Sequence, residues 1–175
     1  MTASSQLRAA IRDIPDFPKP GILFRDITPV LKEPALFRLA IAEFVRGARE
    51  CGAAKIAGID ARGFLFGATV AHELGLGFVP IRKKGKLPFR SVGEAYDLEY
   101  GSAEIEVHID AFEPGEKVAL IDDLLATGGT AGAAIRLIRR TGAEPVIAQF
   151  LIELSELGGR SALCDMPVSS IVAYP

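Results

Sequence analysis

The chain has 175 residues, of which 49% are hydrophobic and 24% charged, a composition that predicts one globular domain and argues against long disorder. Its 18 Gly and 11 Pro favour many turns over a helical bundle. The net charge of −2 argues against nucleic-acid binding, which needs a basic domain, and no apolar run approaches the ~18 residues of a membrane span.

The hydrophobic patterns predict alternating helices and strands. In chain order these are a helix over 34–51, a strand over 55–59, a helix over 64–74, strands over 78–81, 102–109 and 118–121, a helix over 130–140, and strands over 145–152 and 170–174. Residues 83–95 are predicted to form a loop, and the length of this loop in a compact domain suggests a functional role. Strands that alternate with helices predict a single α/β domain over residues 1–175, with a central, mainly parallel sheet flanked by helices.

The segment 118–130 carries the strongest chemical signal. An apolar strand runs into Asp122 and Asp123, and the turn Thr127–Thr130 leads into the next predicted helix. Glycines in such a turn let the backbone approach an anion, and the helix points free N–H groups at it. Ionised carboxylates accept hydrogen bonds from hydroxyl groups. The order of these features predicts a site for a ribose 5-phosphate, and the alternative is a capped helix with a solvated Asp pair.

Two further segments are ambiguous when taken alone. Residues 16–29 combine a stiff Pro- and Gly-containing backbone with Phe24, which suits a flat heterocycle, but packing of Phe17 and Phe24 into the core explains them as well. Residues 82–90 carry five cations and no acid, which suits an anionic group or a solvated loop.

With only two His and two Cys in the chain, a zinc site is not expected, and His72 and His108 are interpreted as surface positions of a helix and a strand. The two Cys also predict a reduced, cytoplasmic protein, because they are too few for a disulfide framework, and the first residues lack the apolar stretch of a signal peptide.

Together these segments resemble motifs of the type I phosphoribosyltransferases, which use phosphoribosyl pyrophosphate (PRPP). Val118–Thr130 resembles their PRPP motif. From Asp16 to Leu154 the chain is similar to the adenine phosphoribosyltransferases, and four blocks occur in that family's order: a base-binding segment (Asp16–Pro29), a pyrophosphate loop (Asp60–Gly67), a basic loop (Arg82–Pro88) and an active-site flap (Tyr96–Gly101). The resemblance implies the type I fold with a small N-terminal hood, mainly residues 1–33, and a flexible flap loop. It also implies transfer of the phosphoribosyl group of PRPP to adenine, giving AMP and pyrophosphate in purine salvage.

The resemblance further implies roles for individual residues. Adenine would be bound by backbone groups of Leu23 and Arg25 and by the side chains of Phe24 and Leu154. The ribose hydroxyls would bind Asp122 and Asp123, and the 5-phosphate would bind Ala126, Thr127, Gly128, Gly129 and Thr130, here called the phosphate loop. The pyrophosphate would lie near Asp60, Ala61, Arg62, Arg82, Lys83 and Lys86, and the peptide bond after Asp60 is often cis in this family. Catalysis would involve Arg62, the proton-transfer residue Glu99 with Asp97 as its substitute, and Tyr100 in flap closure.

The resemblance also implies Mg²⁺, held mainly by PRPP and pyrophosphate rather than by protein side chains, and a homodimer. Small departures are Ala61, where some members have Ser, and the segments 89–92 and beyond Leu154, which match no firm pattern. Two other functions stay open: a transferase for hypoxanthine, guanine or another base, and a PRPP sensor without catalysis.

Overall fold

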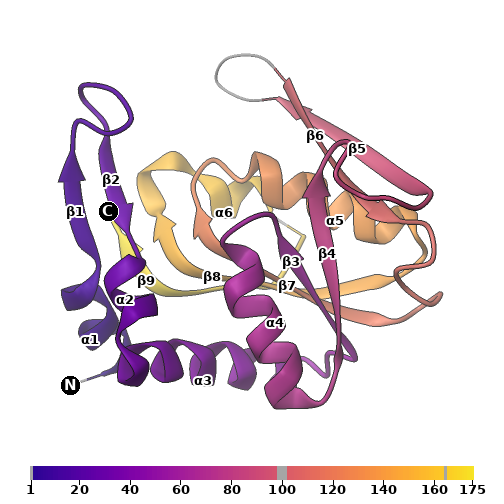
Figure 1. Cartoon of the computed structure of the whole chain (residues 1–175), viewed down its shortest axis with the longest axis horizontal. Coiled ribbons are helices and arrows are strands. Elements are labelled where there is room, and N and C mark those ends of the chain that lie inside the picture. Colours follow the sequence, from indigo (N-terminus) through magenta and orange to yellow (C-terminus); the bar gives the residue numbers. More distant parts are fainter. Residues whose placement is uncertain (1, 98–101, 164) are drawn as a thin grey trace.

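The computed structural model describes residues 2–97, 102–163 and 165–175. Its centre is a seven-stranded sheet in the order β5-β6-β4-β3-β7-β8-β9, and the five strands from β4 to β9 in this order are parallel (Figure 1). The strands are β3 (Lys55–Ile59), β4 (Gly77–Lys83), β5 (Ser91–Asp97), β6 (Ser102–His108), β7 (Lys117–Leu125), β8 (Glu144–Leu154) and β9 (Val168–Tyr174). The predicted class, a mainly parallel sheet flanked by helices, is confirmed.

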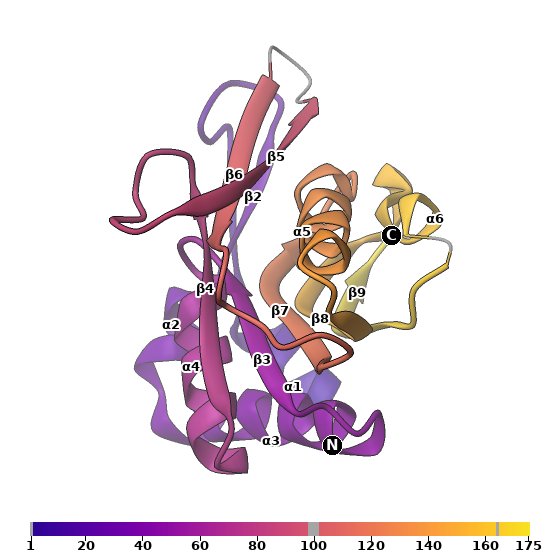
Figure 2. The same cartoon turned by 90° about the vertical axis from the view of Figure 1, so that its right-hand side faces the viewer.

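Helices cover both faces of this sheet, so apolar side chains of β3, β7 and β8 are buried on each side. On one face Phe44 and Phe66 pack against Ile56, and on the other Ile138 packs in the cluster of Leu120. The helices are α1 (Ala3–Ala10), α2 (Thr28–Lys32), α3 (Pro34–Glu50), α4 (Gly63–Leu74), α5 (Gly129–Arg140) and α6 (Gly159–Ala162), with a 3₁₀ turn, η1 (Ser155–Leu157). Figure 2 shows α4 and α5 on opposite sides of the sheet. No helix in the described part of the chain is long and apolar enough to cross a membrane.

The N-terminal segment adds a small antiparallel ribbon, β1 (Arg12–Pro15) and β2 (Leu23–Asp26), which stands beside the main sheet (Figure 1). The ribbon is attached to β9, because the guanidinium carbons of Arg8 and Arg25 lie 4.5 and 4.0 Å from the ring centre of Tyr174. Such cation–π contacts add to the apolar packing of Leu7 and Ile27. Residues near the two ends of the chain thus hold this ribbon in place.

The predicted elements agree with the structure except at the loop over 83–95 and the N-terminal segment. The strand over 55–59 is confirmed at both ends, and the strands over 118–121 and 145–152 are longer than predicted. The loop is wrong for Lys83, which ends β4, and for residues 91–95, which belong to β5 and pair antiparallel with β6. Because β5 is an edge strand with few apolar residues, its hydrophobic pattern is weak.

The crossovers on either side of β3 decide where a ligand can bind. The connection from β3 to β4 runs through α4 on one face, and the connection from β7 to β8 runs through α5 on the other. Strands β3 and β7 are parallel neighbours, so both end at the same edge of the sheet, and the chain leaves them toward opposite faces. Open α/β sheets bind ligands at such a switch point.

Candidate active site

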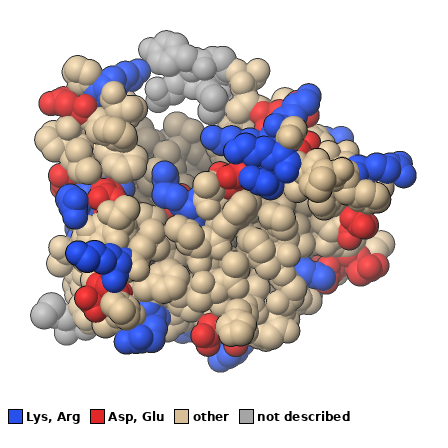
Figure 3. Space-filling view, in the orientation of Figure 1, with Lys and Arg blue, Asp and Glu red and all other residues tan. Residues whose placement is uncertain are grey.

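A cleft of about 400 Å³ lies at this switch point. It is lined by the residues that follow β3, by residues of β4 and β5, and by the end of β7 with the start of α5: Asp60, Ala61, Arg62, Lys83, Tyr96, and residues 122–131. Figure 3 shows a hollow at the top of the molecule, beside a group of Lys and Arg side chains. The structure therefore brings the predicted ribose, phosphate and pyrophosphate segments into one cleft.

The phosphate loop forms the floor of one end of this cleft. Gly128 has φ +85° and is the N-cap of α5, so the free N–H groups of the first helical turn face the cleft without a side-chain cap among the described residues. A Cβ at Gly128 would lie 2.8 Å from the carbonyl oxygen of Gly159. The glycine is thus required both by the backbone angle and by the close packing of the loop on α6.

The two acidic residues lie within β7, because the strand continues to Leu125. Asp123 is buried and pairs with the guanidinium of Arg62, while the backbone N–H of Asp123 donates to Oδ1 of Asp122 at 2.8 Å. Burial and the nearby charge of Asp123 raise the pKa of Asp122 well above its usual range. A ligand hydroxyl that donates to this carboxylate would favour its charged form.

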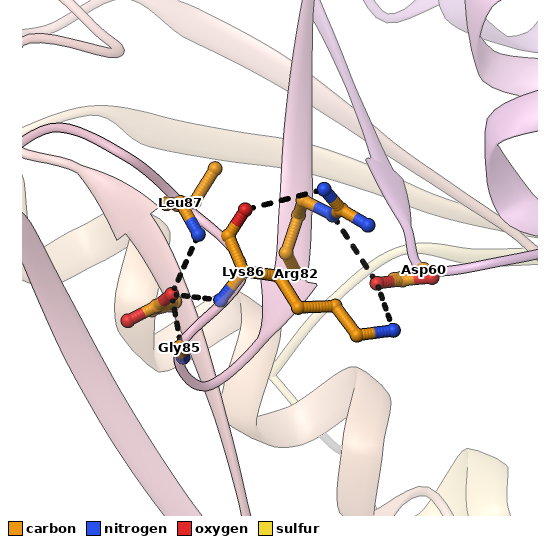
Figure 4. Close-up of polar contacts among 6 residues, drawn as sticks. Asp60, Arg82, Gly85, Lys86 and Leu87 are labelled. Carbon is orange, nitrogen blue, oxygen red and sulfur yellow. Dashed lines mark hydrogen bonds and ion pairs between the residues drawn. The ribbon is translucent and has the colours of Figure 1, made fainter.

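At the opposite end, the peptide bond between Asp60 and Ala61 is cis, as the resemblance implied. The Asp60 side chain is only 7% exposed, and its Oδ2 lies 3.3 Å from Arg82 Nε and 3.7 Å from Lys86 Nζ. Figure 4 shows both cations reaching this one carboxylate from β4 and the basic loop. Two predicted residues outside the cleft lining, Arg82 and Lys86, are therefore held at its edge.

The predicted base-binding residues lie on β2 and at the end of β8. The Phe24 ring meets the Phe17 ring edge-on at 5.1 Å and lies 6.0 Å from the guanidinium carbon of Arg62. Phe17 is half exposed, which argues against the core packing considered for this pair. Phe24, Arg62 and Asp123 thus form a continuous path from the N-terminal ribbon to the ribose end of the cleft.

The other predicted base-site residues are Leu23, Leu154 and Arg25. Leu23 is exposed, and Leu154 is the partly buried last residue of β8. The Arg25 side chain turns to Asp13 and Tyr174, which leaves its backbone as the group available to a base. Glu99 and Tyr100 lie outside the described residues.

Some residues near the cleft were not assigned a role from the sequence. Tyr96, on β5, lines the cleft, and the sequence placed it only at the start of the flap block Tyr96–Gly101, without a role of its own. Behind the phosphate loop, Arg160 donates to both carboxylate oxygens of Glu153, at 3.0 and 2.6 Å, and so holds α6 against β8. Glu153 directly precedes the predicted base-site residue Leu154, but neither Glu153 nor Arg160 was assigned a role from the sequence. His72 is exposed on α4, as interpreted from the sequence, whereas His108 on β6 is only partly exposed, and its buried Nε2 has no hydrogen-bond partner among the described residues.

Comparisons with known proteins identify the family. Residues 40–162 match the model of the phosphoribosyl transferase domain. The chain is 60% identical over 165 residues to the adenine phosphoribosyltransferase of Neorhizobium galegae, covering 93% of this chain and 91% of that one. Among solved structures it is similar to the adenine phosphoribosyltransferases of Rhodothermus marinus (TM-score 0.93, 52% identity, 98% of both chains) and Saccharomyces cerevisiae (TM-score 0.92, 40% identity, 97% and 98%), the latter bound to adenine and an imino-altritol bisphosphate. This chain therefore belongs to the adenine phosphoribosyltransferase family of type I phosphoribosyltransferases.

Proposed function

We propose that this chain is an adenine phosphoribosyltransferase that converts adenine and PRPP to AMP and pyrophosphate in purine salvage. The proposal depends on one observation: the cleft offers helix N–H groups at one end, cations at the other, and the carboxylates of Asp122 and Asp123 between them. PRPP has a phosphate, vicinal hydroxyls and a pyrophosphate in the same order. In support, a related enzyme from Trypanosoma brucei, 26% identical, was solved with AMP, pyrophosphate and ribose-5-phosphate.

In the proposed reaction, the bond from the anomeric carbon to pyrophosphate breaks and a bond to an adenine ring nitrogen forms. The phosphate loop would hold the 5-phosphate, and Asp122 and Asp123 would accept hydrogen bonds from the ribose hydroxyls. Arg82, Lys83 and Lys86 would stabilise the charge that develops on the leaving pyrophosphate. Arg62 would contact the pyrophosphate, and its location between Phe24 and Asp123 supports a contact with the base and the ribose end as well.

Mg²⁺ is the proposed metal, bound mainly through PRPP and pyrophosphate oxygens. Carboxylate oxygens are ligands that suit it, and those of Asp122 and Asp123 line the same cleft, where they would meet it through its water shell. When bound, it would neutralise charge on the pyrophosphate.

We assign the N-terminal segment, mainly residues 1–33, as a hood over the base. Phe24 and Leu154 would contact the two faces of adenine, and backbone groups of Leu23 and Arg25 would contact its edge. The location of the Phe24 ring beside Arg62, which lines the cleft, supports this role.

The experiment that tests the reaction is pyrophosphate release from PRPP and Mg²⁺ with adenine, hypoxanthine, guanine or no base. Release with adenine alone is expected. Release with another base would contradict the base assignment of residues 16–29, and PRPP binding without release would favour the sensor.

The resemblance assigns to Glu99 the transfer of the proton that adenine loses. Glu99→Gln is expected to lower kcat by ~10²–10⁴-fold, the usual range for a lost acid–base group, and to leave the KM for PRPP nearly unchanged. Asp97→Asn is the matched variant, because it removes the neighbouring candidate carboxylate. If Asp97→Asn loses activity and Glu99→Gln keeps it, the role belongs to Asp97.

A homodimer and a cytoplasmic location are also proposed. The apolar groove between α3 and α4, lined in part by Phe37, Ile41 and Val45, offers a surface for a second copy. Light scattering on the purified chain tests the dimer, and cell fractionation tests the location.

A further inference from the structure

A buried carboxylate holds the basic loop from the neighbouring strand. Glu106 lies on β6 and is 7% exposed. Its Oε1 accepts hydrogen bonds from the backbone N–H groups of Gly85, Lys86 and Leu87, at 3.0, 3.2 and 3.2 Å. These three donors are labelled in Figure 4. Its Oε2 accepts one from the Ser91 hydroxyl at 3.0 Å. Four donors between residues 85 and 91 thus converge on a single side chain.

Three successive backbone N–H groups that point at one oxygen form a concave anion site. Such sites commonly hold phosphate, but here the anion is a side chain of the same protein. Burial acts to raise the pKa of Glu106, but hydrogen bonds from Ser91, Leu87, Gly85 and Lys86 outweigh it and hold the pKa below its usual range. Glu106 is therefore a charged anchor at neutral pH.

Contacts of the basic loop connect this anchor to the cleft. The carbonyl oxygen of Lys86 accepts a hydrogen bond from Arg82 Nη1 at 3.2 Å. Arg82 Nε and Lys86 Nζ both lie near Oδ2 of Asp60, at 3.3 and 3.7 Å, and Asp60 lines the cleft. The backbone path that Glu106 fixes therefore sets the positions of two cations at the cleft edge.

We propose that Glu106 is a positioning residue, which shapes the basic loop so that Arg82 and Lys86 meet the pyrophosphate group of PRPP. The inference rests on the proposed function, because that function places the pyrophosphate at Asp60. A purely structural role would instead affect folding, or the binding of both substrates alike.

Glu106→Gln is the decisive variant, because it keeps the shape of the side chain and removes its charge. We expect the KM for PRPP, and that for pyrophosphate in the reverse reaction, to rise roughly tenfold, since charged hydrogen bonds to the loop are weakened. The KM for adenine and for AMP should change less than twofold. Ser91→Ala removes one of the four donors and should raise the KM for pyrophosphate by about two- to threefold.

Glu104→Gln is the matched control. Glu104 lies two residues away on the same strand and pairs with Lys84 at 2.6 Å, outside the cleft. Wild-type constants are expected for it. An equal rise for Glu104→Gln and Glu106→Gln, or an equal rise for adenine and PRPP, would overturn the proposal.

Thermal unfolding of each variant and calorimetric titration with inorganic pyrophosphate complete the test. If Glu106→Gln does not fold, Ser91→Ala decides, and unchanged pyrophosphate affinity in it overturns the proposal. If the wild type releases no pyrophosphate with adenine, the proposed function fails, while the titration still decides the role of Glu106. An active wild type with unchanged constants in Glu106→Gln refutes the positioning role alone.

Discussion

The phosphate loop and the basic loop both turn backbone N–H groups toward an anion, but they differ in where the anion comes from. At the phosphate loop, the first turn of α5 opens into the cleft, so its N–H groups are available to a ligand. At the basic loop, the N–H groups are occupied by Glu106, and the side chains of Arg82 and Lys86 are what reach the cleft. One loop binds with its backbone and the other uses its backbone to present charge.

The largest expected effect comes from adding a side chain to the phosphate loop at Gly128. Gly128→Ala would place a Cβ 2.8 Å from the Gly159 carbonyl oxygen at φ +85°, where a side chain costs roughly 1–2 kcal/mol. The N–H groups would shift, and a displacement of about 1 Å at a reacting centre costs about 10²-fold. We expect kcat/KM for PRPP to fall at least ~100-fold by steady-state kinetics.

Gly132→Ala is the control for this variant. It lies in the same helix, and its added Cβ would come no closer than 3.4 Å to Arg136 Nη1. Alanine inside a helix is expected to stabilise by about 0.5–1 kcal/mol, so activity should persist and the melting temperature should rise. Equal losses in both variants would mean that α5 as a whole, rather than its first turn, is sensitive.

Removing the carboxylates between the two loops is the next test. Asp122→Asn combined with Asp123→Asn is expected to weaken PRPP binding about 10- to 100-fold, because each Asn side chain still accepts a hydrogen bond but lacks the charge, so each of the two bonds is weakened by about 1 kcal/mol. Titration calorimetry with PRPP measures the effect, and the exposed Asp110→Asn is the control. Unchanged affinity would remove the ribose assignment of this pair.

Those features of the two loops that follow from contiguous residues could be predicted from the sequence. The order of β7, Asp122, Asp123, Gly128 and α5 is local, so its pattern was sufficient to predict a phosphate site. Glu106 could not be predicted, because in an alternating strand a glutamate indicates a solvent-facing position. Only the pairing of β6 with β4 brings its carboxylate under the basic loop.

The same reasoning explains which parts of the fold were predicted. The strand over Lys55–Ile59 has no charged residue after Lys55, and it is buried from Ile56 onward, as expected. The ribbon of β1 and β2 was missed, because it depends on contacts of Arg8 and Arg25 with Tyr174, near the other end of the chain. Sequence patterns report local order, whereas contacts across more than a hundred residues leave no such pattern.

A smaller effect is expected from the cations of the basic loop. Lys86 Nζ lies near Asp60, whereas Lys84 Nζ pairs with Glu104 outside the cleft. Lys86→Met should raise the KM for PRPP about fivefold, which corresponds to about 1 kcal/mol for one partly exposed charge. Lys84→Met should change it less than twofold. The Lys86 effect should shrink at high salt, since exposed charges are screened, and an effect of Lys84→Met as large as that of Lys86→Met would contradict the assignment.

The smallest expected effect concerns the support behind the phosphate loop. Hydrogen bonds from Arg160 hold the pKa of Glu153 below its usual range, so the folded state binds this proton less readily than the unfolded chain does. The stabilisation is therefore present above the unfolded pKa of ~4.3 and is lost as the pH falls through the lower folded value.

Glu153→Gln should lower the melting temperature at pH 7 by about 2–4 °C and flatten its decline below pH ~4.3. The exposed Glu156→Gln is the control. If the melting temperatures of Glu153→Gln and the wild type fall in parallel as the pH is lowered, the ion pair does not support the phosphate loop. The packing of Gly159 against the phosphate loop is then the support that remains.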